Sequence, residues 1–305
     1  MVWVKSLAEK APESGRRAFD RRTIKQQSVC TAQTDCRFVP NRLSRGMITI
    51  IINISNRLHI STTSDNAAQL ARDNNIGLEI TEFCTAWNLD TYFEQSDKAA
   101  RKNMQNINRF TFHAPFNELT PAAIDPLILD ITRKRYNQAF DIMQGYGINK
   151  MIAHSGYMPH VYYEQWFIPK SISFWKDFLK DKPDDFQLCL ENVLEDSPHM
   201  LVEIVKEVDD KRLKICFDPA HSGIMGKDIP ALDWAKQVLP YLGHVHIHNN
   251  YGEFDTHNAL NDGIIDIASL IALIAKENPY ATFSIESIDA KSSITWLKEK
   301  GFVIN

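Results

Sequence analysis

Short apolar runs alternate with segments of helical period along most of this chain. The runs have the length and the β-branched or aromatic content of buried strands, and they cover residues 48–54, 77–83, 109–113, 150–154, 186–192, 213–218, 244–249 and 282–286. Between them, segments such as AAQLARDN and MLVEIVKEV carry apolar residues at i, i+3 and i+4, as amphipathic helices do. Eight strand–helix units in roughly 250 residues predict an α/β fold, a (β/α)8 TIM barrel in a single domain.

The first 46 residues do not share this pattern. They are irregular and basic, with 10 Lys or Arg against 4 Asp or Glu, which leaves 24 against 34 for residues 47–305. We therefore expect residues 1–46 to be a disordered N-terminal extension and residues 47–305 to be the barrel. Because clustered Lys and Arg provide the affinity for a phosphate backbone, the acidic balance of the barrel disfavours a nucleic-acid partner.

The cysteines and the hydropathy of the chain indicate in which cellular compartment the protein is expected. The five cysteines show no CxxC spacing, which favours reduced, mostly buried thiols over a disulfide framework. The chain has no run of about 18 apolar residues, so no membrane span is predicted. Its charged first residues do not resemble a signal peptide, and a cytoplasmic location is the expectation.

Histidines and carboxylates recur where the predicted strands end. In a TIM barrel these ends and the loops after them form one mouth, so side chains there meet. Imidazole and carboxylate groups suit a divalent metal ion such as zinc, manganese, cobalt or magnesium. The candidate ligands are His113, His154, Glu191, Asp218, His221, His246, Asp255, His257 and Glu286.

The alternation of side chains along a strand assigns each candidate a face. Small or polar residues share the candidates' face, as expected of a barrel interior, and they include Thr111, Cys189, Cys216 and Ser284. His244, His246 and His248 all share one face, so alternation alone does not choose among them. His248 is the alternative to His246. Isolated histidines such as His59, His160 and His199 are interpreted as surface or hydrogen-bonded residues.

The motifs that hold these residues resemble those of a known superfamily. HAPF, HSG, LEN, DPAH, HxHxN, DxHNxxxDG and a closing IES follow one another between residues 113 and 287. This order resembles the xylose isomerase-like TIM barrel superfamily, which holds sugar phosphate isomerases and epimerases together with endonuclease IV (AP endonuclease family 2). The resemblance covers nearly all of residues 47–305 and does not by itself choose one reaction.

The resemblance implies two alternative ligand patterns. The epimerase pattern holds a single metal on Glu191, Asp218, His246 and Glu286, whereas the endonuclease IV pattern holds three zinc ions on all nine candidates. The chain departs from endonuclease IV after the DxH pair, where it has Asn261, Asp262 and Gly263. It also lacks an evident counterpart of that family's basic DNA-intercalating loops after His113.

Three functions follow as expectations. The first is a metal-dependent isomerase or epimerase of a sugar, sugar phosphate or related polyol, in which Glu191 and Glu286 carry an enediolate-type proton transfer. The second is a multinuclear zinc phosphodiesterase of the endonuclease IV type. The third is a barrel that binds a metal or sugar without turnover. The aromatic residues within 162–175 could form a subunit interface, so a homo-oligomer is one expectation.

Overall fold

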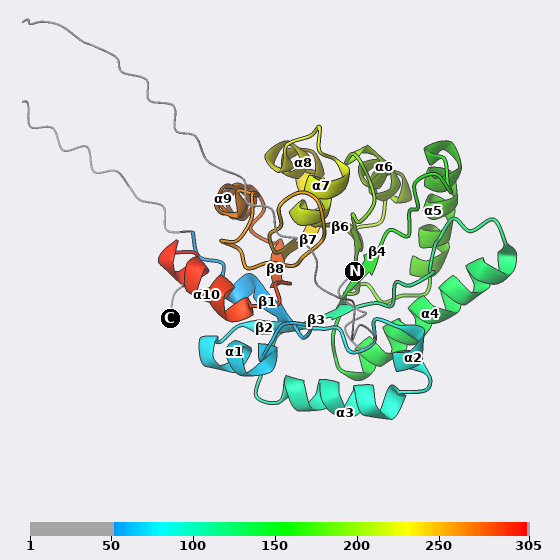
Figure 1. Cartoon of the computed structure of the whole chain (residues 1–305). Helices are drawn as coiled ribbons and strands as arrows, with labels where there is room; N and C mark the ends of the chain where they lie inside the picture. The colour runs from blue at the N-terminus through cyan, green and yellow to red at the C-terminus, as the bar shows by residue number, and fades with distance from the viewer. Residues whose placement is uncertain (1–51, 304–305) are drawn as a thin grey trace, which may run out of the picture. The chain divides into compact units, whose positions relative to one another are not determined.

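The computed structural model describes residues 52–303, which form a closed barrel of eight parallel strands in sequential order (Figure 1). The prediction of a TIM barrel is therefore confirmed. Each strand contributes four to six residues, and its two neighbours satisfy its backbone groups. The strands are β1 (Leu58–Ser61), β2 (Gly77–Ile80), β3 (Phe110–His113), β4 (Lys150–His154), β5 (Gln187–Glu191), β6 (Leu213–Phe217), β7 (Leu242–Ile247) and β8 (Thr282–Ile285).

Helices surround the barrel and connect its strands (Figure 1). Several begin at an aspartate that accepts a hydrogen bond from a backbone N–H of the first turn, as Asp125 does from Leu127. The helices are α1 (Ala67–Asn74), α2 (Ala86–Leu89), α3 (Phe93–Met104), α4 (Pro126–Gly145), α5 (Glu164–Leu179), α6 (His199–Val208), α7 (Pro219–Met225), α8 (Ala231–Val238), α9 (Ile267–Glu277) and α10 (Ala290–Glu299), with short 3-10 turns at Ser55–Arg57 and Leu239–Tyr241.

The position of the first strand was predicted wrongly. Of the predicted range 48–54, residues 48–51 lie outside the described part of the chain and residues 52–54 are not a strand. The strand is instead Leu58–Ser61, whose sequence LHIS contains a histidine. His59 is buried, and its Nδ1 lies 3.2 Å from the carbonyl oxygen of Phe283 on β8. The interior of a barrel tolerates such a polar residue. The strand was predicted at residues 48–54 because the apolar run there is longer than LHIS.

The N-terminal extension predicted for residues 1–46 also lies outside the described residues, so its boundary at residue 47 stays a prediction. Cys30 and Cys36 fall in the same part of the chain. The cysteines of the described part, Cys84, Cys189 and Cys216, are buried free thiols, as expected.

Two apolar regions flank the strands. The larger core lies between the strands and the helices, and the smaller cluster of Ile152, Cys189 and Cys216 is separate from it. The side-chain alternation predicted this division. The outward residues that join the larger core include Leu188, Leu190, Ile215, Phe217, Val245 and Ile247.

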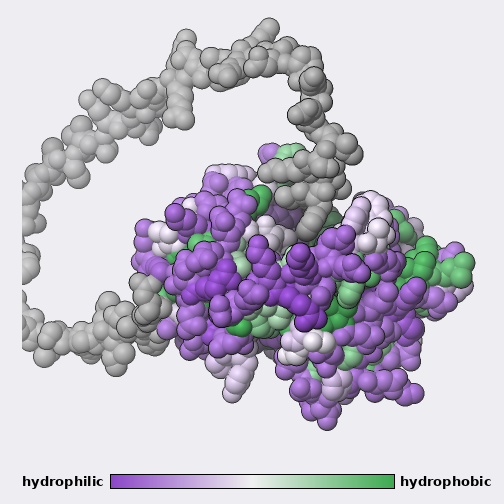
Figure 2. Space-filling view, turned by 90° about the horizontal axis from the view of Figure 1, so that it is seen from below, coloured by the Kyte–Doolittle hydropathy of each residue, from purple (hydrophilic) through white to green (hydrophobic). Residues whose placement is uncertain are grey.

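The face shown in Figure 2 is mainly hydrophilic, with hydrophobic side chains scattered over it. Among the described residues, no helix has both the length and the apolar character needed to cross a membrane.

Candidate metal centre

Four candidate ligands meet where β5, β6, β7 and β8 end. We call Glu191, Asp218, His246 and Glu286 the inner cluster; one donor atom from each lies within 4.8 Å of the others. Nδ1 of His246 is 3.2 Å from Oε1 of Glu191 and 3.3 Å from Oε2 of Glu286. Glu191 ends β5, whereas Asp218 and Glu286 directly follow β6 and β8. The barrel itself therefore sets this geometry.

Glu191 also lies close to two histidines, from β3 and β4. Its Oε2 is 3.5 Å from Nε2 of His113, which ends β3, and 3.6 Å from Nε2 of His154, which ends β4. The ring of His154 stacks on Phe116 with 4.3 Å between the ring centroids. His113, His154 and Glu191 form a second group of donors that could hold a cation, so one carboxylate is shared between two groups.

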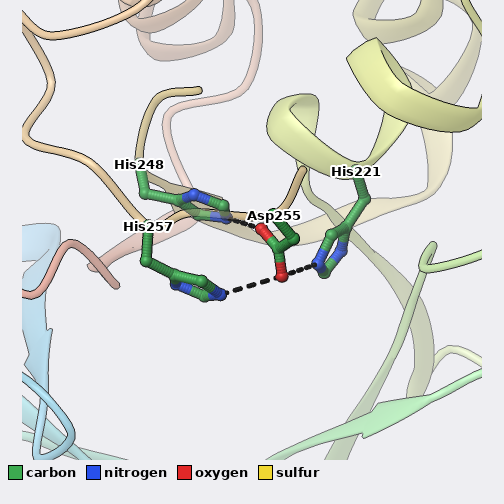
Figure 3. Close-up of side chains that lie close together, drawn as sticks. All are labelled: His221, His248, Asp255 and His257. Atoms are coloured by element: carbon green, nitrogen blue, oxygen red, sulfur yellow. Dashed lines mark hydrogen bonds and ion pairs between the residues drawn. The ribbon is translucent and has the colours of Figure 1, made fainter. Parts of the chain in front are cut away.

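The remaining candidates gather beside the inner cluster. His221, His248, Asp255 and His257 form what we call the outer cluster (Figure 3). Oδ2 of Asp255 is 3.0 Å from Nε2 of His257 and 3.3 Å from Nε2 of His221. Nε2 of His248 lies 3.8 Å from Oδ1 of Asp255. All nine candidate ligands thus lie in three adjoining groups of donors.

The carboxyl groups of the inner cluster differ in acidity. Burial raises the pKa of Glu191, but His246 and His154 lower it more and hold it well below its ordinary value. Burial also raises the pKa of Glu286; His246 offsets part of this, and the adjacent charge of Glu191 raises it further. The two glutamates therefore have pKa values shifted in opposite directions.

The pKa of His154 is shifted in the opposite direction from the pKa values of His221 and His257. Burial lowers the pKa of His154 to about 3, so its imidazole is neutral. Burial also lowers the pKa of His221, but Asp218 and Asp255 raise it more and leave it well above its ordinary value. Burial lowers the pKa of His257, but the hydrogen bond with Asp255 and the charges of Glu286 and Asp255 together raise it to about 9. Neutral imidazoles bind metal directly, whereas protonated ones must first release a proton.

A divalent cation fits these residues. Several donor atoms that face the clusters are buried without a hydrogen-bond partner in the described structure, among them Oε2 of Glu191, Nδ1 of His246 and Oδ1 of Asp255. Buried polar groups without partners are costly, and coordination to a metal would satisfy them. Imidazole nitrogens together with carboxylate oxygens suit zinc or manganese.

Asp218 has two roles in the structure. Its Oδ1 accepts hydrogen bonds from the backbone N–H groups of Ala220 and His221 and so caps α7. Its Oδ2 lies 3.0 Å from Nε2 of His248. The neighbouring Asn192 accepts a hydrogen bond from the N–H of Asp218 and donates one to its carbonyl oxygen. The cap and the amide together fix the direction of this carboxylate.

Glu79 lies beside the inner cluster and was not predicted from the sequence. It is fully buried in β2, and its Oε1 lies 3.1 Å from Nε2 of His246. Its Oε2 accepts hydrogen bonds from the hydroxyls of Thr111 and Ser284. The signal in the sequence was a carboxylate in the middle of an otherwise apolar strand, away from the strand ends where ligands were predicted. Glu79 orients His246 so that Nδ1 faces the inner cluster.

Other polar residues lie apart from the clusters. Asp262 accepts a hydrogen bond from the hydroxyl of Tyr251, and Asn249 binds the carbonyl oxygens of Leu260 and Ile265. His199 is exposed and lies 3.3 Å from Glu203.

The comparisons with known proteins agree with this architecture. A model of the xylose isomerase-like TIM barrel family matches residues 69–300. The chain is 27% identical to the uncharacterized protein MJ1311 of Methanocaldococcus jannaschii over 205 residues, which are 63% of this chain and 70% of that protein. The chain belongs to the xylose isomerase-like TIM barrel family, and the resemblance found in its motifs is confirmed.

Solved structures show the same fold. A D-tagatose 3-epimerase-like protein has a TM-score of 0.62 and 22% identity, with 80% of this chain and 96% of that chain covered. The TTHB071 protein of Thermus thermophilus, soaked with ZnCl2, has a TM-score of 0.64 and 18% identity, with 80% and 97% covered. At these identities the likeness shows the barrel and leaves the reaction to be argued from the site.

Proposed function

We propose that this protein is a metal-dependent isomerase or epimerase of a sugar, sugar phosphate or related polyol. One observation carries the proposal: Glu191 at the end of β5 and Glu286 just after β8 approach the same nitrogen of His246 at 3.2 and 3.3 Å. Two carboxyl groups that face one buried site can serve as the base and the acid that move a proton between carbon atoms or faces.

A metal bound by Glu191, Asp218, His246 and Glu286 would polarise the carbonyl and the adjacent hydroxyl of the substrate. The ionised carboxylate of Glu191 would take the proton from the carbon next to the carbonyl group. The carboxyl group of Glu286 would return a proton to the enediolate-type intermediate. The polar side chains of His113 and His154 would bind substrate hydroxyls.

The similarity to a D-tagatose 3-epimerase-like protein supports a small sugar as the substrate class. A panel of ketoses and ketose phosphates in deuterated water tests this proposal. Turnover through carbon–hydrogen cleavage would place deuterium next to the carbonyl group, which NMR detects. If metal-loaded protein bound a sugar of the panel and neither exchanged deuterium nor formed an isomer, the barrel would be a binding protein and the proposal would fail.

A second candidate is a multinuclear metal phosphodiesterase of the endonuclease IV type. The observation that favours it is the gathering of all nine candidate ligands into three adjoining groups with Glu191 shared between two of them. Metal ions held by these groups would supply a nucleophilic hydroxide and a Lewis acid for the hydrolysis of a phosphate ester. The balance of 24 basic against 34 acidic residues in 47–305 counts against DNA as its substrate. Hydrolysis of bis(p-nitrophenyl) phosphate and cleavage of abasic DNA, assayed beside the sugar panel, separate the two candidates.

A further inference from the structure

We infer that Glu195 is a positioning residue of the candidate active site: it joins the connection after β5 to Ser155, which directly follows His154, and so holds His154 in place opposite Glu191. Glu195 is not one of the nine candidate ligands, and its hydrogen bonds go to none of them. The expected effect on the reaction rests on the proposed function, whereas the effect on the position of His154 does not depend on it.

Glu195 lies in the short connection between β5 and α6 and is only 1% exposed. Its Oε2 accepts hydrogen bonds from the backbone N–H groups of Val193 and Leu194, at 2.7 and 3.1 Å. Its Oε1 accepts a hydrogen bond from the hydroxyl of Ser155, in the connection after β4. One carboxyl group therefore fixes the turn of its own connection and reaches across to the neighbouring one.

A carboxyl group is costly to bury in this position. Burial raises the pKa of Glu195, and the hydrogen bonds from Ser155 and the backbone offset part of that rise. None of the three donors carries a charge, so none of them forms an ion pair that offsets the removal of the carboxylate from water. An apolar side chain could fill a buried site without this cost, which points to the bridge to Ser155 as the reason for a glutamate here.

Ser155 transmits this constraint to the backbone beside His154. Its hydroxyl donates to Glu195 and accepts a hydrogen bond from the N–H of Tyr157 at 3.1 Å. Its own N–H donates to the carbonyl oxygen of Glu191 at 3.0 Å, which continues the pairing of β4 with β5 by one residue. The turn that follows His154 is therefore held against the connection after β5 by the side chain and the backbone of one serine.

His154 depends on this backbone more than three other histidines of the site do. His113, His221 and His257 each place Nδ1 2.8 or 2.9 Å from a backbone carbonyl oxygen, a contact that fixes the direction of the ring. Within residues 52–303, no carbonyl oxygen holds the ring of His154 in this way. This ring stacks on Phe116, and its Nε2 lies 3.6 Å from Oε2 of Glu191. The position of the backbone therefore decides where the imidazole of His154 lies.

In the proposed reaction, the bridge serves substrate binding more than the chemical step. His154 would bind a substrate hydroxyl, whereas Glu191 ends a strand and owes its position to the barrel. Loosening the turn after β4 would therefore move His154 and leave Glu191 in place. A weaker bridge should raise KM and change kcat little.

Two variants break the bridge from opposite ends. Glu195→Asp keeps the charge but shortens the side chain by one methylene group, so that it no longer spans the two connections, and Ser155→Ala removes only the hydroxyl. Glu82→Asp is the matched control. Glu82 follows β2 and accepts a hydrogen bond at 2.8 Å from the hydroxyl of Thr62, which follows β1. This is the same kind of bridge between two strands that carry none of the nine candidate ligands.

The first readout is the NMR spectrum of the full chain with ¹³C-labelled histidine rings, loaded with magnesium, which is diamagnetic and prefers oxygen ligands. His154→Asn assigns the signal of His154. Because its ring stacks on Phe116 with 4.3 Å between centroids, the ring current of the phenyl group shifts its protons upfield. We expect the signal to move downfield in Glu195→Asp and in Ser155→Ala, to move no further in the double variant, and to stay in place in Glu82→Asp.

The second readout is steady-state kinetics with a sugar that the ketose panel identifies. We expect KM to rise about 3- to 10-fold in Glu195→Asp and in Ser155→Ala, as for one weakened hydrogen bond to the substrate, with kcat within about twofold of the wild type. Glu82→Asp should keep both constants, and circular dichroism checks the fold of every variant.

An unchanged His154 signal in both bridge variants would overturn the inference, and so would a shift of equal size in Glu82→Asp. A signal that moves while KM stays constant would also overturn it, because the bridge would then not serve the reaction. If no sugar of the panel turned over, the proposed function would fail, and the NMR signals alone would still decide whether Glu195 positions His154.

Discussion

The inner and outer clusters use similar donors but are built in different ways. The inner donors come from the ends of four successive strands, and even the most accessible of them, Glu286, is only 11% exposed. In the outer cluster, three of the four donors come from one connection, residues 248–257, and Asp255 is 23% exposed. A closed barrel places strand ends through its own backbone hydrogen bonds, whereas a connecting segment must be held by contacts that it makes itself.

This difference predicts how each cluster responds to change. The inner cluster should depend on single carboxylates and on the residues that aim them. The outer cluster should depend on the order of the β7–α9 segment and on the protonation of its histidines.

The largest effect is expected at Glu191, which the inner cluster shares with His113 and His154. Glu191→Gln should lower kcat/KM by at least about 10³-fold, equivalent to about 4 kcal/mol, because both the base and a metal ligand are lost. Steady-state kinetics and metal content measure this change, and circular dichroism checks the fold. Glu207→Gln, at an exposed position on α6, is the matched control. Wild-type turnover in Glu191→Gln would remove Glu191 from the catalytic site.

Glu79 is expected to act on the inner cluster alone. Because it fixes the ring of His246, Glu79→Gln should weaken metal binding there by about 10- to 100-fold and leave the affinity of the outer cluster unchanged. Glu82→Gln is the control, since Glu82 accepts hydrogen bonds from Thr62 and Asn103. Competition titrations measure both affinities. Equal losses at the two clusters would mean that Glu79 supports the barrel as a whole.

A change at Asn249 is expected to affect the outer cluster more than the inner one. Its buried side chain donates to two carbonyl oxygens of the β7–α9 segment and accepts from the N–H of Ile265. Asn249→Ala should cost about 1–3 kcal/mol of stability and weaken the outer cluster more than the inner one. Asn278→Ala is the control, because Asn278 also binds backbone groups through its amide, beside the start of β7. Similar metal affinities in both variants would show that the segment does not hold the outer donors.

The smallest effect is expected from pH. The pKa of His257 is raised to about 9, so this histidine is protonated at neutral pH before metal binds, and the pKa of His221 is also raised. Metal binding at the outer cluster should therefore release protons, and its affinity should rise with pH until about 9. Calorimetry at pH 7.5 in two buffers of different ionisation enthalpy measures the release. Identical heats in the two buffers would contradict the protonated state of these histidines.

The interior face of each strand followed from alternation, because a period of two leaves little freedom once a strand is assigned. The same reasoning failed at β1, where the short LHIS carries a histidine inside the barrel and a longer apolar run lies just before it. Glu79 was not predicted as a site residue for a related reason, because it lies in the middle of an apolar strand. Its buried carboxylate is stabilised in the middle of an apolar strand by His244 and His246 of β7, at 3.2 and 3.1 Å, and by the hydroxyls of Thr111 and Ser284.

The amino-acid sequence by itself determined the TIM barrel, its strand-end histidines and carboxylates, and the family to which the chain belongs, because these follow from periodicity and the order of motifs. Only the tertiary structure decided which donors share a cluster, that Glu79 orients His246, and that His248 lies among the outer donors. These facts depend on how eight strands stagger around a closed barrel and on how one connection folds back. The spacing of residues along the sequence does not encode the stagger of the strands or the path of this connection.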